Sequence, residues 1–138
     1  MPDIDRRSAL AISLAGLSGL VLPEQAAGQT YGPTEGKELT QGVRQIDLGE
    51  RDSVIPAYKK VRLRDIVLQP GAKTPDNAMM NDMLCHMTEG ELAVVQNDKQ
   101  FTVKKGDVWT CAKGITTEGT QNKTNAVAIM RIIDLLTT

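Results

Sequence analysis

The feature that most limits the fold of this chain is a series of short segments of β-branched and aliphatic residues, each closed by a turn signal. Segment 61–68 ends at Pro70 and Gly71, and segment 107–111 ends at Lys113 and Gly114. The remaining segments are 43–48, 83–87, 92–96, 100–103 and 126–135. Many short strands at this spacing are typical of a β-sandwich or barrel. The sequence therefore predicts an all-β domain over 43–138, with 126–135 as its closing strand.

Length and charge limit the classes of function. The chain has 138 residues, of which 41% are hydrophobic and 24% charged, as expected for one globular domain. Its 16 basic and 17 acidic residues give a formal net charge of -1. A field strong enough to attract a polyanion needs an excess of positive charge. We therefore expect no nucleic-acid partner.

Residues 1–28 have the pattern of a cleavable export signal. Arg6 and Arg7 precede a weakly apolar run over 8–22, and the small residues Ala26, Ala27 and Gly28 follow it. The arginine pair is similar to a twin-arginine signal, which predicts a periplasmic or secreted protein without membrane attachment after cleavage. The run is too short and too polar to serve well as a permanent anchor. A buried N-terminal helix is the alternative.

Residues 29–42 are rich in Gly, Thr, Glu and Lys without periodicity, which predicts a flexible lead-in to the domain. Export would place the two cysteines of the chain, Cys85 and Cys111, in an oxidising compartment. Their separation in the sequence does not decide whether they touch. A disulfide and two free thiols both stay open.

Two spacings in the predicted domain have the form of a known pair of motifs. The first frame consists of Gly71, Asn77, Met79, Met83 and Gly90. The second frame consists of Gly106, Ala112, Gly114, Thr117 and Gln121. Together they resemble the two signature motifs of the cupin family, whose turns fall at the same places. The resemblance implies a single cupin-type jelly-roll β-barrel.

The resemblance also implies where a metal would bind. In cupins the first frame normally carries His, His and Glu and the second carries His, and these ligands hold an Fe, Mn, Zn, Ni or Cu ion inside the barrel. The matching positions here are Asn77, Met79, Met83 and Thr117. An amide, two thioethers and a hydroxyl are poor ligands for a hard or borderline divalent ion. We therefore expect neither the family's metal nor another cofactor.

Strand alternation predicts which side chains face the barrel interior. If Met83 points inward, Cys85 and Met87 share its face, while Leu84 and His86, the single histidine, point outward. The predicted cavity is mostly apolar with a few hydrogen-bonding groups, which suits a small, largely uncharged organic ligand. Its lining is Asn77, Met79, Met83, Cys85, Met87, Thr117 and Gln121, with Asn77, Thr117 and Gln121 as polar contacts.

Two other functions stay open, and with them the question of whether the protein is an enzyme. A metal-independent isomerase or lyase, as in the wider cupin superfamily, would need a titratable group inside the barrel. Cys85 is predicted to face inward, whereas Asp76, Asp82 and Glu118 are expected on loops beside the mouth. A soft-metal protein would instead bind Cu(I) through the methionines and cysteine of 79–87.

The family resemblance also implies a homodimer.

Two further patterns have ordinary structural explanations. Lys60, Arg62 and Arg64 alternate along one predicted strand and are expected to form a solvated basic face. The sequence Asn122-Lys123-Thr124 fits a glycosylation sequon, which a bacterial export route would leave unused.

Overall fold

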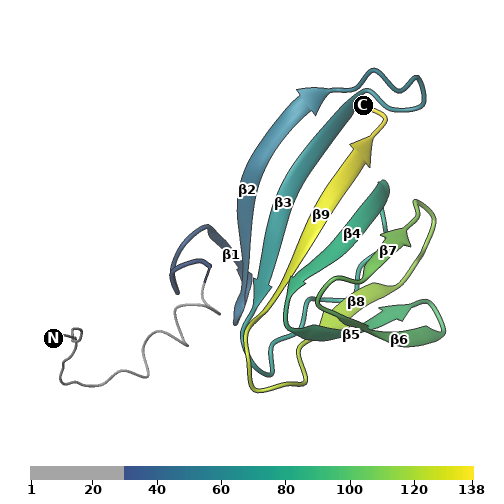
Figure 1. Cartoon of the computed structure of the whole chain (residues 1–138). Coiled ribbons are helices and arrows are strands. Elements are labelled where there is room, and N and C mark those ends of the chain that lie inside the picture. The colour runs from purple at the N-terminus through teal and green to yellow at the C-terminus, as the bar shows by residue number, and fades with distance from the viewer. Residues whose placement is uncertain (1–29) are drawn as a thin grey trace, which may run out of the picture. The chain divides into compact units, whose positions relative to one another are not determined.

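The computed structural model describes residues 30–138, and every regular element in that range is a β-strand (Figure 1). The strands are β1 Lys37–Thr40, β2 Val43–Asp52, β3 Lys60–Leu68, β4 Asp82–Glu89, β5 Glu91–Gln96, β6 Lys99–Lys104, β7 Val108–Cys111, β8 Glu118–Gln121 and β9 Ala128–Leu136. All of them belong to one compact unit, Pro33–Thr138. The predicted all-β fold is confirmed. The described residues include no helix that could cross a membrane, and the predicted export signal, 1–28, lies outside them.

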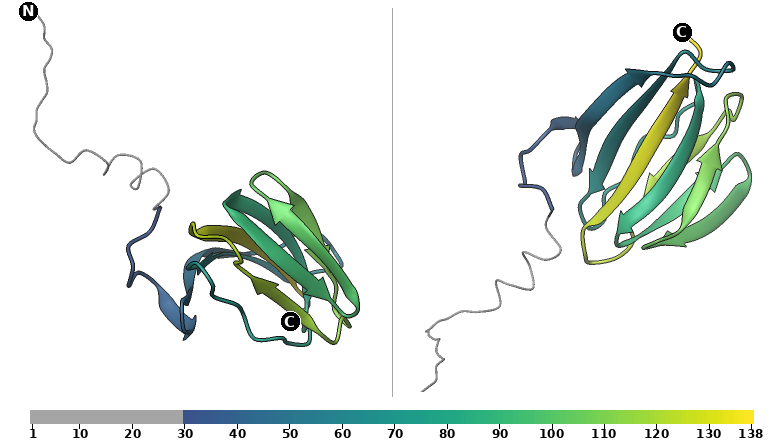
Figure 2. Two further views of the ribbon diagram at one scale, coloured as in Figure 1. Left: turned by 90° about the horizontal axis from the view of Figure 1, so that it is seen from below. Right: turned by 45° about the horizontal axis from the view of Figure 1, so that its top comes forward.

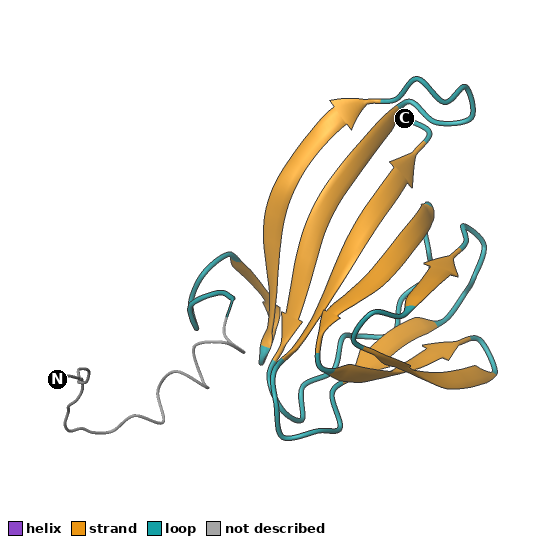
Figure 3. Ribbon diagram, in the orientation of Figure 1, coloured by secondary structure: helices purple, strands orange, loops and turns teal. Residues whose placement is uncertain are grey.

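The strands form two antiparallel sheets. A large sheet has the order β1-β2-β3-β9-β4-β7, and a small sheet has the order β6-β5-β8. The small sheet faces one end of the large sheet, as further views show (Figure 2). Within residues 30–138, turns and loops alone connect the strands (Figure 3). The predicted closing strand is β9, which pairs with β3 and β4 in the middle of the large sheet. The arrangement is consistent with the predicted jelly roll.

Gly90 is the corner at which the chain passes from the large sheet to the small one. β4 ends at Glu89 and β5 begins at Glu91. The φ angle of Gly90 is +75°, and a Cβ atom there would lie 2.6 Å from the carbonyl oxygen of Val127. Glycine is the residue that accepts a left-handed conformation this close to another backbone. The predicted turn at 89–90 therefore joins the two sheets.

The segment predicted as a flexible lead-in, 29–42, contains a strand. β1 is the edge strand of the large sheet and pairs with β2. The guanidinium of Arg44 on β2 donates hydrogen bonds to the backbone carbonyls of Thr34, Glu35 and Gly36, each at 2.9 Å. These contacts are with a later strand, so no pattern within 34–42 could reveal the strand.

The core lies where the two sheets overlap. Its buried side chains come from both sheets and are mainly aliphatic or sulfur-containing. They are Val43, Ile66, Leu68, Cys85, Met87, Leu92, Val94, Val103, Trp109, Cys111, Ala128, Met130 and Ile132. Burial of such side chains is the main favourable contribution to folding.

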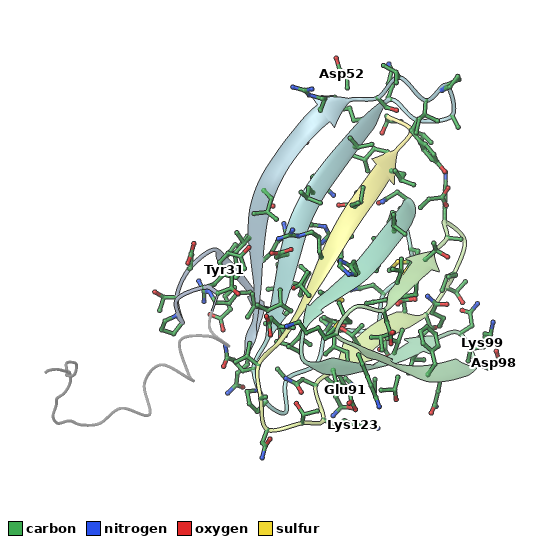
Figure 4. The ribbon with its side chains drawn as sticks, viewed as in Figure 1. Tyr31, Asp52, Glu91, Asp98, Lys99 and Lys123 are labelled. Atoms are coloured by element: carbon green, nitrogen blue, oxygen red, sulfur yellow. The ribbon has the colours of Figure 1, made fainter. Side chains whose placement is uncertain are left out.

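The inner face of β3 changes character along its length. Leu68 and Ile66 are buried in the core, whereas the side chains of Arg64, Arg62 and Lys60 are 15%, 39% and 43% exposed. Asp52, which pairs with Lys60, lies at the end of the large sheet farther from the small sheet (Figure 4). The basic residues expected on a solvated face therefore continue the core face of β3 toward solvent.

Candidate functional site

A cavity of about 240 Å³ lies where the inner face of the large sheet changes from apolar to charged. One wall consists of two neighbouring rows of paired residues. The first row runs from Arg64 through Ile132 and Cys85 to Trp109, and the second contains Met83 opposite Cys111. The small sheet contributes Glu118 and Thr120 of β8, and the loop before β4 contributes Thr74, Pro75, Asn77 and Met79. The cavity therefore joins elements from most of the domain.

Part of the predicted lining is found in this cavity. The predicted residues that line it are Asn77, Met79, Met83 and Cys85. Met87 lies on the same face of β4, as alternation predicts, but is fully buried in the core. Leu84 and His86 are exposed on the opposite face, also as alternation predicts. The residues of β4 that alternation predicts to point inward and outward therefore do so in the structure.

The predicted lining differs from the structure around β8. Thr117 precedes this strand, and its backbone N–H binds the side chain of Asn97 at 3.1 Å. Gln121 lines a separate surface hollow on the small sheet. The residues of β8 whose side chains line the cavity are Glu118 and Thr120. The motif frame therefore misses the inward positions of this strand by one residue.

Trp109 and Glu118 each have a polar atom that is unsatisfied within the described residues. Both residues line the cavity and are only 9% and 8% exposed. The indole Nε1 of Trp109 and the Oε1 atom of Glu118 are buried and have no hydrogen-bond partner among residues 30–138. Buried polar groups are almost always paired, because an unpaired group keeps the cost of its desolvation. The cavity wall therefore contains a buried donor and a buried acceptor that no described residue satisfies.

The carboxyl group of Glu118 has a raised pKa. Burial raises the pKa of this group, and neighbouring Cys111 and Gln96 oppose the rise only in part. The other two carboxylates predicted beside the mouth lie elsewhere. Asp76 lines the hollow on the small sheet, and Asp82 binds Tyr58 and the backbone of Lys113. Glu118 is thus the carboxyl group in the cavity wall.

Arg64 places a fixed positive charge in the cavity wall. Its Nε atom lies 2.7 Å from Asp134 Oδ2 and its Nη2 atom 3.0 Å from Asp134 Oδ1. Arg62 and Asn81 donate to the same carboxylate. Burial would raise the pKa of Asp134, but the hydrogen bonds and charge of Arg64, with help from Asn81 and Arg62, hold it below its usual value. The ionised carboxylate therefore fixes the guanidinium in place.

The two cysteines meet in the same wall. Their Sγ atoms are 3.9 Å apart, and both are buried free thiols. This distance is well above the ~2.05 Å of a disulfide bond. The hydrogen bond with Cys111 raises the pKa of the Cys85 thiol, and burial raises it further. Cys85 is therefore held as a neutral thiol.

The residues present do not fit the divalent metal expected in a cupin. Asn77, Met79 and Met83 stand at the cavity but offer an amide and two thioethers, and Thr117 stands outside its lining. Among residues 30–138, no group of three or more His, Cys, Asp or Glu side chains is placed to hold a metal ion. His86 is on the outer face. A hard or borderline ion would lack both imidazole and a set of carboxylates.

Comparisons with known proteins identify the fold. No family model matches the sequence, and no curated protein matches it significantly. A cupin superfamily protein from Desulfitobacterium hafniense is 18% identical with a TM-score of 0.56, over 74% of this chain and 83% of that chain. An RmlC-like cupin from Shewanella frigidimarina is 17% identical with a TM-score of 0.57, over 77% and 88% of the two chains.

A third similar structure is a sugar phosphate isomerase from a cupin superfamily of Silicibacter pomeroyi. It is 22% identical with a TM-score of 0.55, over 69% of this chain and 60% of that chain. At such identities the likeness concerns the fold alone, because one fold serves many functions. Together with the two facing antiparallel sheets, these likenesses show that the chain has the cupin fold.

Proposed function

We propose that this protein binds a small, largely uncharged organic molecule in the cavity between its sheets. The observation that carries the proposal is the pair of buried polar atoms, Trp109 Nε1 and Glu118 Oε1, without partners among the described residues. Each unpaired buried group costs about 1–3 kcal/mol. A ligand that accepts a hydrogen bond from Trp109 and donates one to Glu118 would remove both costs.

The cavity limits the size and chemistry of this ligand. Its volume of about 240 Å³ is below the ~300–1,000 Å³ that is usual for drug-sized molecules. The side chains of Met79, Met83 and Ile132 favour an apolar body. The Arg64 guanidinium favours a hydrogen-bond acceptor at the more polar end. Small alcohols and amides with an N–H group combine these features.

The fluorescence of Trp109 provides the test, since it is the single tryptophan of the chain. We expect at least one compound from a panel of small alcohols and amides with an N–H group to change its emission saturably. Glu118→Ala should weaken binding at least ~10-fold, the equivalent of one lost hydrogen bond to a buried group. Gln121→Ala is the matched control, because Gln121 is on the same strand outside the cavity lining. No response to the whole panel, or equal losses in both variants, would contradict the proposal.

A metal-independent isomerase or lyase is the second candidate, and the buried carboxyl group of Glu118 favours it. A carboxyl group in a cavity wall, with a pKa raised by burial, can act as an acid or base toward a bound molecule. The similar Silicibacter structure is described as a sugar phosphate isomerase, which supplies a first substrate class to test. Incubation with sugar phosphates in D₂O would reveal enzymatic exchange of carbon-bound protons by NMR. Exchange that persists in Glu118→Gln would exclude this role for Glu118.

We also propose that the protein is exported, on the basis of the sequence pattern in 1–28. Cell fractionation should find it in the periplasm or medium, with a mature N-terminus near Gln29. Replacement of Arg6 and Arg7 by lysine should retain it in the cytoplasm if the twin-arginine route is used. An intact N-terminus in the recovered protein would refute cleavage.

A homodimer is the proposed assembly. The outer face of the large sheet carries exposed apolar side chains, including Leu84 and Val108, and an apolar hollow formed by Val61, Leu63 and Ile133. Exposed apolar patches of this kind often mark protein interfaces. Light scattering should give twice the mass of the mature chain, and Leu84→Glu should reduce it to the monomer mass. A monomer at all concentrations would contradict the assembly.

A further inference from the structure

Three sulfur atoms are brought together on the wall of the cavity. Met83 and Cys85 lie two residues apart on the inner face of β4, and Cys111 lies directly opposite Met83 on β7. Directly opposite side chains in an antiparallel pair are close neighbours, with Cβ atoms about 4.5–5.5 Å apart. All three residues line the cavity. The pairing of β4 with β7 thus brings these side chains together. We call Met83, Cys85 and Cys111 the sulfur cluster.

The spacing of the two thiols matches that of ligands on a common metal ion. Their Sγ atoms are 3.9 Å apart. Two sulfur ligands with metal–sulfur bonds of about 2.3 Å in a trigonal or tetrahedral site are separated by about 3.8–4.0 Å. A metal could therefore bind both sulfur atoms with little movement of β4 or β7.

The charge around the cluster favours a monovalent ion. The Nη2 atom of Arg64 lies 3.9 Å from Met83 Sδ, so a guanidinium stands beside the cluster. A monovalent cation bound by two thiolates leaves one net negative charge, which Arg64 faces. Binding breaks two S–H bonds, forms two metal–sulfur bonds and releases two protons to solvent, without oxidation or reduction. Thiolate and thioether ligands select soft ions such as Cu(I) and Ag(I).

We propose that Cys85 and Cys111, with Met83 as a third ligand, form a binding site for a soft monovalent metal ion such as Cu(I). The site differs from a Met-rich segment of 79–87, because it uses Cys111 from another strand and excludes Met80 and His86, which are exposed. It also does not depend on binding of an organic ligand, which the Trp109 titration measures separately.

Titration with Ag(I), which is redox-inert, and with Cu(I) under anaerobic conditions tests the site. The protein is first reduced, and the reductant is then removed under anaerobic conditions, so that both cysteines are free thiols and no competing soft ligand is present. We expect one ion per chain, release of about two protons per ion in weakly buffered solution, and a new thiolate-to-metal absorption band in the ultraviolet. Less than one-tenth of an ion per chain at micromolar metal would overturn the proposal.

Variants identify the ligands. Cys85→Ser and Cys111→Ser should each weaken binding at least ~100-fold, and Met83→Leu by roughly 10-fold, since a thioether is a neutral ligand. Met80→Leu is the matched control, because its thioether is removed from a side chain that is 77% exposed and outside the cavity. Tight binding of one ion by the double Cys→Ser variant, or an equal effect of Met80→Leu, would overturn the assignment.

A measurement on the unaltered chain covers the case in which the serine variants do not fold. Addition of one equivalent of Ag(I) should move the Cβ carbon resonances of both Cys85 and Cys111 in an NMR spectrum. A shift at neither or only one of these carbons would refute the two-thiol site.

Discussion

Arg64 and Asp134 form a two-point ion pair across neighbouring strands of the large sheet, with N–O distances of 2.7 and 3.0 Å. Asp134 is fully buried, and Arg64 is mostly buried beside the cavity. The Asp134 carboxylate thus stabilises the charged guanidinium of Arg64 at the edge of the apolar core. Loss of Asp134 would leave Arg64 without its anionic partner, and would remove the acceptor of Arg62 Nε and one of the two acceptors of Asn81.

Asp134→Ala should therefore lower the free energy of unfolding by about 3–5 kcal/mol, the usual cost of breaking a buried ion pair from one side. Urea denaturation measures the change. Glu50→Ala is the control, because it removes an exposed ion pair with Lys60 and should cost less than ~1 kcal/mol. A similar loss in the free energy of unfolding in both variants would mean that the buried Asp134 ion pair contributes no more than the exposed one.

Glu118 should make the protein less stable as the pH rises. Its pKa in the folded state is raised above the unfolded value of 4.5, so the folded state binds the proton more tightly. The contribution to stability is fully present below pH 4.5 and is lost as the pH rises through the folded pKa. Glu118→Gln, which cannot ionise, should remove this fall in the free energy of unfolding, measured by urea denaturation between pH 4.5 and 8. Gln121→Ala changes no titrating group and should keep the fall, and an unchanged slope in Glu118→Gln would contradict the assignment.

Asn122 should be essential to the connection between β8 and β9. Its buried amide donates to the carbonyls of Leu68 and Ala126 at 3.0 and 2.8 Å and accepts from the backbone and side chain of Thr124. We expect Asn122→Ala to lower the free energy of unfolding by about 2–4 kcal/mol, since several buried groups lose their partners. Exposed Asn125→Ala should change it by less than ~0.5 kcal/mol. Equal stability of the two variants in denaturant would refute this role.

Gly90 should tolerate substitution much less well than Gly71. Both have positive φ angles, +75° and +83°, so alanine is strained at both. A Cβ atom at Gly90 would also collide with backbone of Val127 and Ala128, whereas one at Gly71 has no neighbour within 4 Å. We expect Gly71→Ala to cost about 1–2 kcal/mol and Gly90→Ala at least ~3 kcal/mol in thermal or urea unfolding. Equal costs would mean that the backbone at 127–128 moves aside.

The sequence was sufficient where a strand carries its own pattern. On β4 the alternation from Met83 to Met87 correctly predicts Met83 and Cys85 toward the cavity and Leu84 and His86 toward the outside. β8 has only four residues, so its phase depended on the motif frame, which favoured Thr117 instead of Glu118. One residue of offset exchanges the two faces of a strand.

Features that rest on distant pairing could not be predicted from local patterns. Arg64 and Asp134 are paired because β3 and β9 are neighbours in the sheet, although 70 residues separate them in sequence. The order of 33–42 likewise depends on β1 pairing with β2 and on Arg44. The residue pattern of one segment does not show which strand will lie beside it.

The graded inner face of β3 sets a direction for anything that enters the barrel. Leu68 and Ile66 are buried, and Arg64 is mostly buried. Arg62 and Lys60 are partly exposed to solvent. A molecule with one apolar and one polar end, bound in the cavity, would place its polar end toward Arg64 and its apolar end toward Ile66. Ligands that have the same apolar part and different polar parts should thus bind in the same orientation.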